Sequence, residues 1–237
     1  MNKLLSIETS AESCSVALSI GKNTREKFEH APRRHAELIL PMVSSLLGEA
    51  ELALGQLDGI AFGRGPGSFT GLRIGIGVVQ GLAWGADLPV VPVSSLAAVA
   101  QAALERSPSP GVCRVCVAMD ARMQEVYTAN FAVDVDGFVI LSGEEQVCPP
   151  GKVRPEGTAG VCAAGSGFEV YPELEKLAGE LELYIRDCWP RAGTISRLAA
   201  RWLENNKPLP AAQAQPVYIR NQVAIKPRRS TGQGSVA

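Results

Sequence analysis

A glycine-rich stretch at residues 63–75, GRGPGSFTGLRIG, is the part of this sequence best suited to binding an anion. A glycine-rich turn that leads into a helix leaves backbone N–H groups unpaired, and such groups bind phosphate. Arg64 and Arg73 add positive charge nearby. The stretch nevertheless matches neither G-x-x-x-x-G-K-[ST] nor G-x-G-x-x-G. From the spacing alone, packing within the domain and a subunit interface are equally favoured, and phosphate binding ranks below both.

Two carboxylates occupy corresponding places in the two halves of the chain. Glu8 ends the first predicted strand, and Asp120 ends the matching strand of the second half. A carboxylate in this position can hold a metal ion or a water beside a phosphate. A structural role, in which the side chain orders a turn by accepting hydrogen bonds from backbone N–H groups, is at least as well supported. In that case Asp120, Arg122 and Glu125 form a turn network.

The sequence lacks the usual residues for metal-dependent or nucleophilic hydrolysis. Its two histidines, His30 and His35, do not share a helical face, and neither H-x-x-x-H nor H-E-x-x-H occurs. There is no G-x-S-x-G nucleophile elbow. The C-x-x-C pair Cys113 and Cys116 lies in a predicted strand, where odd spacing sends the side chains to opposite faces. We interpret the six cysteines as buried or incidental thiols of a reducing compartment.

Composition excludes a strongly polyanion-binding or membrane-spanning protein. The net charge is −1 and 20% of the 237 residues are charged, so the chain alone should bind nucleic acid poorly. The beginning of the sequence has no signal-peptide pattern. The most apolar window, residues 88–104, is short and contains Pro89 and Pro92. We expect a cytoplasmic protein that does not contact a membrane.

Glycines are unusually frequent in the helix predicted from residue 70 onward. Each glycine in a helix interior costs about 1 kcal/mol relative to alanine. Gly77, Gly81 and Gly85 recur at i, i+4 and i+8 and therefore line one face of this helix. Close approach of another backbone would offset the cost, so this face is expected to be packed on.

Periodicity and turn residues predict a mixed α/β chain in two related parts. The first part is predicted to have strands at 4–8, 13–20, 24–29, 57–62 and 89–93, and helices at 35–49, 70–86 and 96–104. The second repeats the three-strand opening at 114–120, 125–133 and 137–141, followed by helices at 172–183 and 195–205. The SPSPG linker at 107–111 separates them. We expect an N-terminal lobe at 1–106, a reduced C-terminal lobe at 107–226 and a disordered tail at 227–237. The sequence leaves open whether helix 195–205 returns to the first lobe.

These features together resemble the TsaB (YeaZ) family of the actin/sugar-kinase/Hsp70 (ASKHA) superfamily. The resemblance covers nearly the whole chain, and the block at 63–75 is long enough to be specific. The matching motifs are I-E-T-S at 7–10, R-x-H at 33–35, the block at 63–75, Q-G-L-A at 80–83, D-A-R-x-x-E-V-Y at 120–127 and P-V-Y-I-R at 216–220. The implied fold is α/β, a duplicated two-lobe ASKHA fold with a reduced second lobe.

The resemblance implies a subunit without catalysis of its own. TsaB-like proteins pair with a catalytic paralogue, TsaD, and with the ATPase TsaE, and support threonylcarbamoyl transfer to an adenosine beside the tRNA anticodon. ATP, ADP and metal are then expected on the partner subunits, and tRNA is expected to bind only through the complex. The positions that correspond to the metal-binding histidines of TsaD are Ser95 and Val99, neither of which can replace an imidazole ligand.

The resemblance also implies where the partner binds. Helices 35–49 and 70–86 are expected to pack against the same helices of TsaD, and the related lobes would allow a homodimer when the partner is missing. The expected interface residues are Leu38, Met42, Leu46, Leu72, Ile76, Gly77, Val79, Gly81 and Gly85.

Two alternatives have different requirements. A small nucleotide-dependent ASKHA enzyme would hold a Mg-nucleotide at a vestigial phosphate site formed by Glu8, Thr9, Ser10, Gly65, Gly67, Ser68 and Asp120. A glycoprotease-like peptidase would need a nucleophile or a metal site that the sequence does not display, and it is the least favoured.

Overall fold

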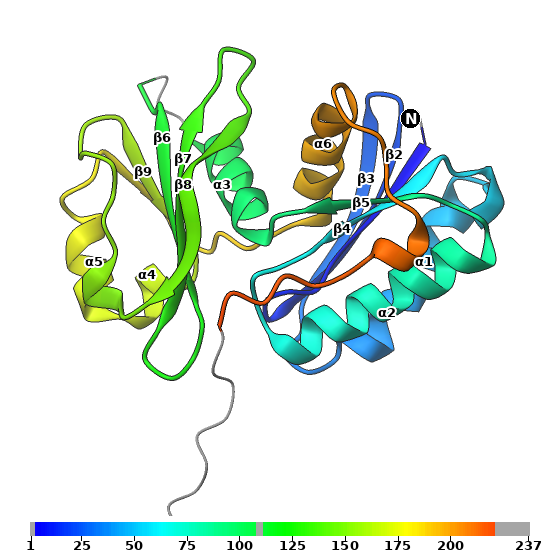
Figure 1. Cartoon of the computed structure of the whole chain (residues 1–237), viewed down its shortest axis with the longest axis horizontal. Coiled ribbons are helices and arrows are strands. Elements are labelled where there is room, and N and C mark those ends of the chain that lie inside the picture. Colours follow the sequence, from blue (N-terminus) through cyan, green and yellow to red (C-terminus); the bar gives the residue numbers. More distant parts are fainter. Residues whose placement is uncertain (1–2, 108–110, 221–237) are drawn as a thin grey trace, which may run out of the picture.

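A computed structural model describes residues 3–107 and 111–220, and within them the chain forms two five-stranded sheets side by side (Figure 1). The first sheet has the order β3-β2-β1-β4-β5, and the second, written from its other edge, has the order β8-β7-β6-β9-β10. In both, three antiparallel strands come first and the fourth strand pairs parallel with the first. The repeated order confirms the predicted α/β fold with two duplicated lobes.

The elements follow the chain in a regular order. The first sheet contains β1 (Lys3–Glu8), β2 (Ser13–Ile20), β3 (Asn23–His30), β4 (Gly59–Gly63) and β5 (Val90–Val93). The second contains β6 (Arg114–Asp120), β7 (Val126–Val133), β8 (Val139–Cys148), β9 (Val161–Ala164) and β10 (Leu183–Ile185). The helices are α1 (His35–Glu49), α2 (Phe69–Gly85), α3 (Ser95–Arg106), α4 (Gly167–Val170), α5 (Pro172–Ala178) and α6 (Ala192–Leu203).

Strand alternation gives the first sheet two apolar faces. Leu5 and Ile7 of β1 point into a core built with α1 and α2, whereas Leu4 joins a smaller cluster with Ile195 and Ala199 of α6. Successive side chains of a strand point to opposite faces, so one strand serves both layers. Helices α1 and α2 therefore cover one face of the first sheet, and α6 covers the other (Figure 1).

Two helices pack across the boundary at residue 106: α3, which is predicted to belong to the first lobe, and α6, whose return to the first lobe the sequence leaves open. Helix α3 precedes this boundary, yet Val99 and its neighbours pack on the second sheet, against Val115 and Phe131. Helix α6 follows it and packs on the first sheet. Each lobe is therefore completed by a helix from the other half of the chain.

The second lobe is reduced because the short 3₁₀ turn Pro150–Lys152 occupies the place that α1 has in the first lobe. Its predicted elements also need correction. Strand β8 extends to Cys148 because it pairs with β7 along its polar residues, and α5 ends at Ala178 instead of continuing to 183.

Part of the predicted linker at 107–111 and the whole predicted tail at 227–237 lie outside the described residues. Among the helices that are described, none combines the length and the apolar character that crossing a bilayer requires.

Candidate functional site

The glycine-rich loop is filled by the protein's own backbone. Ser68 N donates a hydrogen bond to Ser10 O (2.7 Å), and a Cβ at Gly67 would overlap that same carbonyl. Thr9 Oγ1 donates to Gly71 O (2.9 Å), and Gly71 N donates to the capping hydroxyl of Ser68 (3.3 Å). Two of the N–H groups that could bind a phosphate, those of Ser68 and Gly71, are therefore engaged within the chain.

Glu8 is a buried carboxyl group, and within the described part of the chain the groups that donate hydrogen bonds to it are neutral. It is 1% exposed, and its oxygens accept hydrogen bonds from Ser10 N (2.5 Å) and Ser95 Oγ (2.9 Å). Gly63 lies so close that a Cβ there would overlap the carboxyl group. Burial raises the pKa of Glu8 above its ordinary value, and the hydrogen bonds from Ser10 and Ser95 oppose this shift. This environment suits a structural acid better than a ligand for a metal–phosphate complex.

Asp120 is the center of a turn network at the end of β6. It accepts hydrogen bonds from Arg122 N (2.9 Å) and from the hydroxyl of Tyr171 (2.8 Å), and it forms an ion pair with the Arg122 guanidinium (3.1 Å). Burial, followed by the contact with Asp120, raises the pKa of Tyr171 to about 12. Arg122 also pairs with Glu12 of the first lobe.

The predicted nucleotide-site residues come from both lobes. Glu8, Thr9, Ser10, Gly65, Gly67 and Ser68 lie in the first lobe, and Asp120 lies in the second. Gly65 packs against Leu72, where its Cβ would come within 3.0 Å of a side-chain methyl.

The two positions that the resemblance to TsaB matches to metal-binding histidines of TsaD are inside the protein. Ser95 and Val99 are both 0% exposed; Ser95 donates to Glu8, and Val99 belongs to the apolar cluster under the second sheet. Within residues 3–107 and 111–220, no group of three or more His, Cys, Asp and Glu side chains is placed to hold a metal ion.

Five of the apolar residues predicted for a subunit interface are instead part of the monomer's interior. Met42, Leu46, Leu72, Ile76 and Val79 are each at most 8% exposed. They cannot present apolar area to a partner, because the same helical stripe is needed to cover the first sheet. Leu38 is half-buried against this core. The interface prediction is wrong for the five buried residues.

The glycine stripe lies on the outer side of α2. Gly77, Gly81 and Gly85 are exposed, and a Cβ on any of them would meet no atom of residues 3–107 or 111–220 within 4 Å. Trp84 lies beside them with 75% of its side chain exposed, and Leu40 of α1 is 50% exposed. We call these five residues the docking face. Sequence reasoning missed Trp84 and Leu40, although both lie in segments, 38–48 and 74–86, that contain no charged residue.

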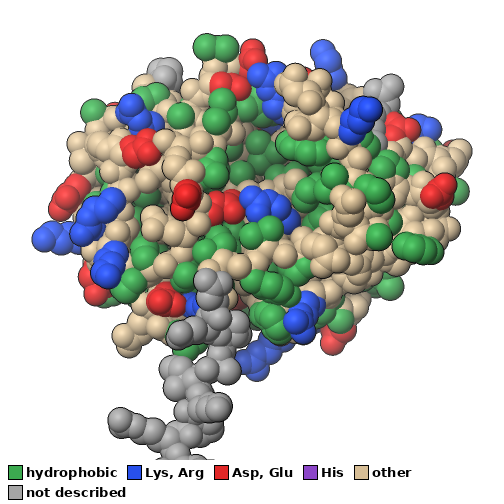
Figure 2. All heavy atoms as spheres, in the orientation of Figure 1, with side chains coloured by type: hydrophobic (Ala, Val, Ile, Leu, Met, Phe, Trp, Pro, Cys, Tyr) green, Lys and Arg blue, Asp and Glu red, His purple; other side chains and the backbone are tan. Residues whose placement is uncertain are grey.

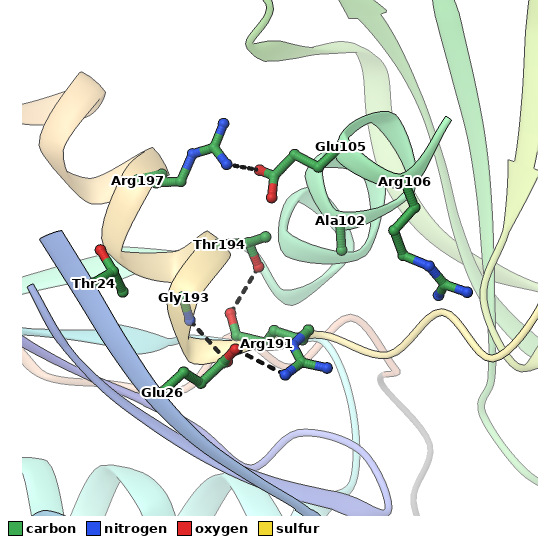
Figure 3. Close-up of a pocket in the computed structure, with 9 residues that line it drawn as sticks. All are labelled: Thr24, Glu26, Ala102, Glu105, Arg106, Arg191, Gly193, Thr194 and Arg197. Carbon is green, nitrogen blue, oxygen red and sulfur yellow. Dashed lines mark hydrogen bonds and ion pairs between the residues drawn. The ribbon is translucent and has the colours of Figure 1, made fainter. Parts of the chain in front are cut away.

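A cavity of about 360 Å³ on another side of the molecule is lined by β3, α3 and α6 (Figure 3). Glu26 accepts hydrogen bonds from Arg191 Nε (3.0 Å) and Gly193 N (3.0 Å), and Arg197 pairs with Glu105 (2.8 Å). Both lining carboxylates are therefore engaged by neighbouring elements. The cavity lies among polar contacts between β3, α3 and α6, and the hydrogen bonds from Arg191 and Gly193 to Glu26 hold the start of α6 in place.

Comparison with known proteins gives a consistent result. The family model described as "TsaD: tRNA N6-adenosine threonylcarbamoyltransferase" matches residues 28–176. The "tRNA threonylcarbamoyladenosine biosynthesis protein TsaB" of Escherichia coli (strain K12) is 40% identical over 230 residues, which cover 94% of this chain and 97% of that protein. The protein of the same name from Haemophilus influenzae is 38% identical and covers 94% and 95%. The solved structure of YeaZ from Pseudomonas aeruginosa is 42% identical, covers 92% of this chain and 100% of its own, and superimposes with a TM-score of 0.84.

Proposed function

The chain belongs to the TsaB (YeaZ) family, and from this premise we propose that it is a non-catalytic partner of a TsaD-type threonylcarbamoyltransferase. It binds this paralogue through the docking face and activates it for threonylcarbamoyladenosine modification of tRNA next to the anticodon. A TsaE-type ATPase completes the complex, which carries out its work in the cytoplasm.

The observation that carries the proposal is the exposed glycine stripe. Gly77 and Gly81, inside α2, together cost about 2 kcal/mol of helix propensity relative to alanine, and no atom of the described residues lies within 4 Å of where the Cβ atoms of the three stripe glycines would be. A stripe that the monomer leaves open suits close packing against a second backbone. Trp84 and Leu40 beside it add exposed apolar area, and aromatic residues such as Trp84 often contribute most to interface affinity.

A role without catalysis is supported by the interior of the cleft. Glu8 is buried against Ser95, the loop at 63–67 packs on Ser10, and Asp120 is held by Arg122 and Tyr171. We propose that the chain uses no cofactor of its own, that metal and ATP or ADP bind to the partner subunits, and that tRNA binds through the complex. Because the partner has a related fold, the same face would support a homodimer when TsaD is missing.

Affinity capture of the protein from lysate of its own source, followed by mass spectrometry, tests the proposal. We expect a larger H-x-x-x-H-bearing paralogue near equimolar amount. Gly81→Leu and Trp84→Ala should abolish or strongly weaken this association while the isolated protein stays folded, and Val170→Ala, at an exposed apolar position of the second lobe, should not.

Two results would contradict the proposal. One is threonylcarbamoyl transfer to tRNA by the purified protein alone. The other is capture of the protein without its paralogue together with submillimolar ATP binding in isolation, which would favour the nucleotide-dependent enzyme instead.

A further inference from the structure

The last described segment of the chain, residues 207–220, is fastened along the first lobe as a strap. Leu209 and Val90 exchange two backbone hydrogen bonds (2.8 Å each), so the strap covers the edge of β5. Further along, Ala214 is fully buried, and its carbonyl accepts a hydrogen bond from Gln80 of α2 (2.7 Å). Val217 N donates to Arg64 O (2.8 Å). Figure 1 shows this segment in orange and red, running past α2 toward the second lobe.

The strap also touches the exposed side of α2. The ring of Tyr218 lies 5.3 Å from that of Phe69, and its hydroxyl accepts a hydrogen bond from Arg73 Nε (3.2 Å). Phe69 and Tyr218 are 41% and 43% exposed, so a partner that packs along α2 can reach both rings. The strap is therefore continuous with the docking face.

The strap ends on the second lobe, where Arg220 contacts the turn between β6 and β7, residues 121–125. Its Nη2 donates to Glu125 Oε2 (2.6 Å) and to Arg122 O (3.4 Å), and its Nη1 lies 3.7 Å from the sulfur of Met123. The guanidinium also lies 5.9 Å from the ring of Tyr127. Only 14% of the Arg220 side chain is exposed, so its ion pair with Glu125 is largely buried on the Arg220 side and differs from an ordinary surface ion pair.

The turn that Arg220 grips has an unfavourable backbone. Arg122, Met123 and Gln124 all adopt left-handed conformations, with φ of 59°, 56° and 60°. Side chains of L-residues disfavour this region, and runs of it persist only where surrounding contacts determine the conformation. Arg220 and the Tyr171–Asp120 hydrogen bond supply such contacts.

The same turn is joined to the first lobe by an ion pair. Arg122 pairs with Glu12, and a second ion pair between the lobes joins Arg64 of the glycine loop to Glu145 of β8 (3.2 Å). Figure 2 shows basic and acidic side chains together at the center of this face, where the lobes meet. The Arg64 residue is shared, because its carbonyl holds Val217 of the strap while its guanidinium holds Glu145.

We propose that residues 207–220 couple the docking face to the closure of the two lobes, with Arg220 as the clasp. The inference rests on the proposed function, since the partner is the TsaD-type paralogue on α2. A partner seated on α2 stabilises Phe69, Arg73 and the strap, and through Arg220 it stabilises the left-handed turn and the Arg122–Glu12 contact. By linkage, loss of the clasp weakens partner binding.

Amide hydrogen exchange on the full-length protein, with and without the purified paralogue, tests this coupling. In the free protein, Arg220→Met should speed exchange in peptides covering 120–127 at least tenfold. In the wild type, the paralogue should slow exchange both in α2 and in 120–127; in Arg220→Met it should slow exchange in α2 alone. Arg186→Met is the matched control, since this exposed arginine of the same lobe contacts the Tyr184 ring away from the clasp.

If Arg220→Met does not fold, Glu125→Gln provides the same test, because it removes the charge that pairs with Arg220. Glu125→Gln should also speed exchange at 120–127 in the free protein and confine the protection by the paralogue to α2. Unchanged exchange at 120–127 in both free variants would overturn the clasp. Protection of 120–127 by the paralogue that persists in the variants would indicate direct contact and overturn the coupling. Absence of protection in α2 of the wild type would instead refute the proposed function, and the free-protein rates would still decide the clasp.

Discussion

Replacing Gly77 and Gly81 by alanine should make the isolated protein more stable and its complex weaker. Both positions are inside α2, and a Cβ at either meets no atom within 4 Å in the part of the chain that the structure describes. Each substitution should therefore recover the helix propensity that glycine lacks, about 1 kcal/mol, or about 2 kcal/mol for the pair. For a chain of this size, about 1 kcal/mol raises Tm by about 2–4 °C, so the double variant should melt about 4–8 °C higher.

The complex should respond in the opposite direction. Added methyl groups in a close helix contact typically cost about 1–3 kcal/mol, which corresponds to at least a fivefold rise in Kd for the TsaD-type paralogue. Thermal unfolding, at concentrations where sedimentation shows a monomer, gives the first quantity, and titration calorimetry gives the second.

The same helix offers a matched control. A Cβ at Gly71 would overlap the carbonyl oxygen of Thr9, and one at Gly75 would overlap its hydroxyl. Gly71→Ala and Gly75→Ala should therefore lower Tm, although the substitution and the helix are the same. A lower Tm for the Gly77/Gly81 variant would refute the conclusion that the stripe is open. A higher Tm with unchanged Kd would refute its use in docking.

Two further predictions concern the cleft. Glu8→Gln should leave Tm near the wild-type value at pH 4.5 and raise Tm increasingly above that pH. Burial raises the folded-state pKa of Glu8, so the stability contributed by the protonated carboxyl group of the wild type is lost as pH rises through that pKa. The uncharged glutamine side chain of the variant does not undergo this loss. Each unit of pKa difference corresponds to about 1.4 kcal/mol; thermal unfolding from pH 4.5 to 8 measures it, and a pH-independent difference would contradict it. Introducing a histidine pair with Ser95→His and Val99→His should lower Tm by several degrees without creating a metal site, since both positions are fully buried. Zinc or iron binding with a stoichiometry near one would contradict this prediction.

Local pattern was sufficient for much of the fold. The apolar periodicity of α1 predicts its observed bounds, His35–Glu49, because that stripe must face the sheet. Strand β8 was predicted too short, since SGEEQ lacks alternation and becomes a strand only by pairing with β7. Helix α6 begins at Ala192, three residues before its predicted start, because Ser15 and Glu26 bind the N–H groups of Ala192 and Gly193.

The candidate site divides in the same way. The i, i+4, i+8 glycine spacing is local information, so the sequence by itself determined that α2 has a glycine face. The sequence alone does not show which face of α2 is covered in the monomer. Leu72, Ile76 and Val79 share the helix with Gly77 and Gly81, and only packing on the first sheet decides that the former are core and the latter surface.

The clasp depended on tertiary structure entirely. Arg220 is 95 residues from Glu125, and nothing in its own sequence neighbourhood indicates an ion pair with that residue. The family motif, the glycine face and the missing histidine pair were determined by the sequence, because each depends on residue type and short spacing. Burial of Glu8, exposure of Trp84 and the connection between the lobes were decided by the fold, because each depends on side chains brought together from distant parts of the chain.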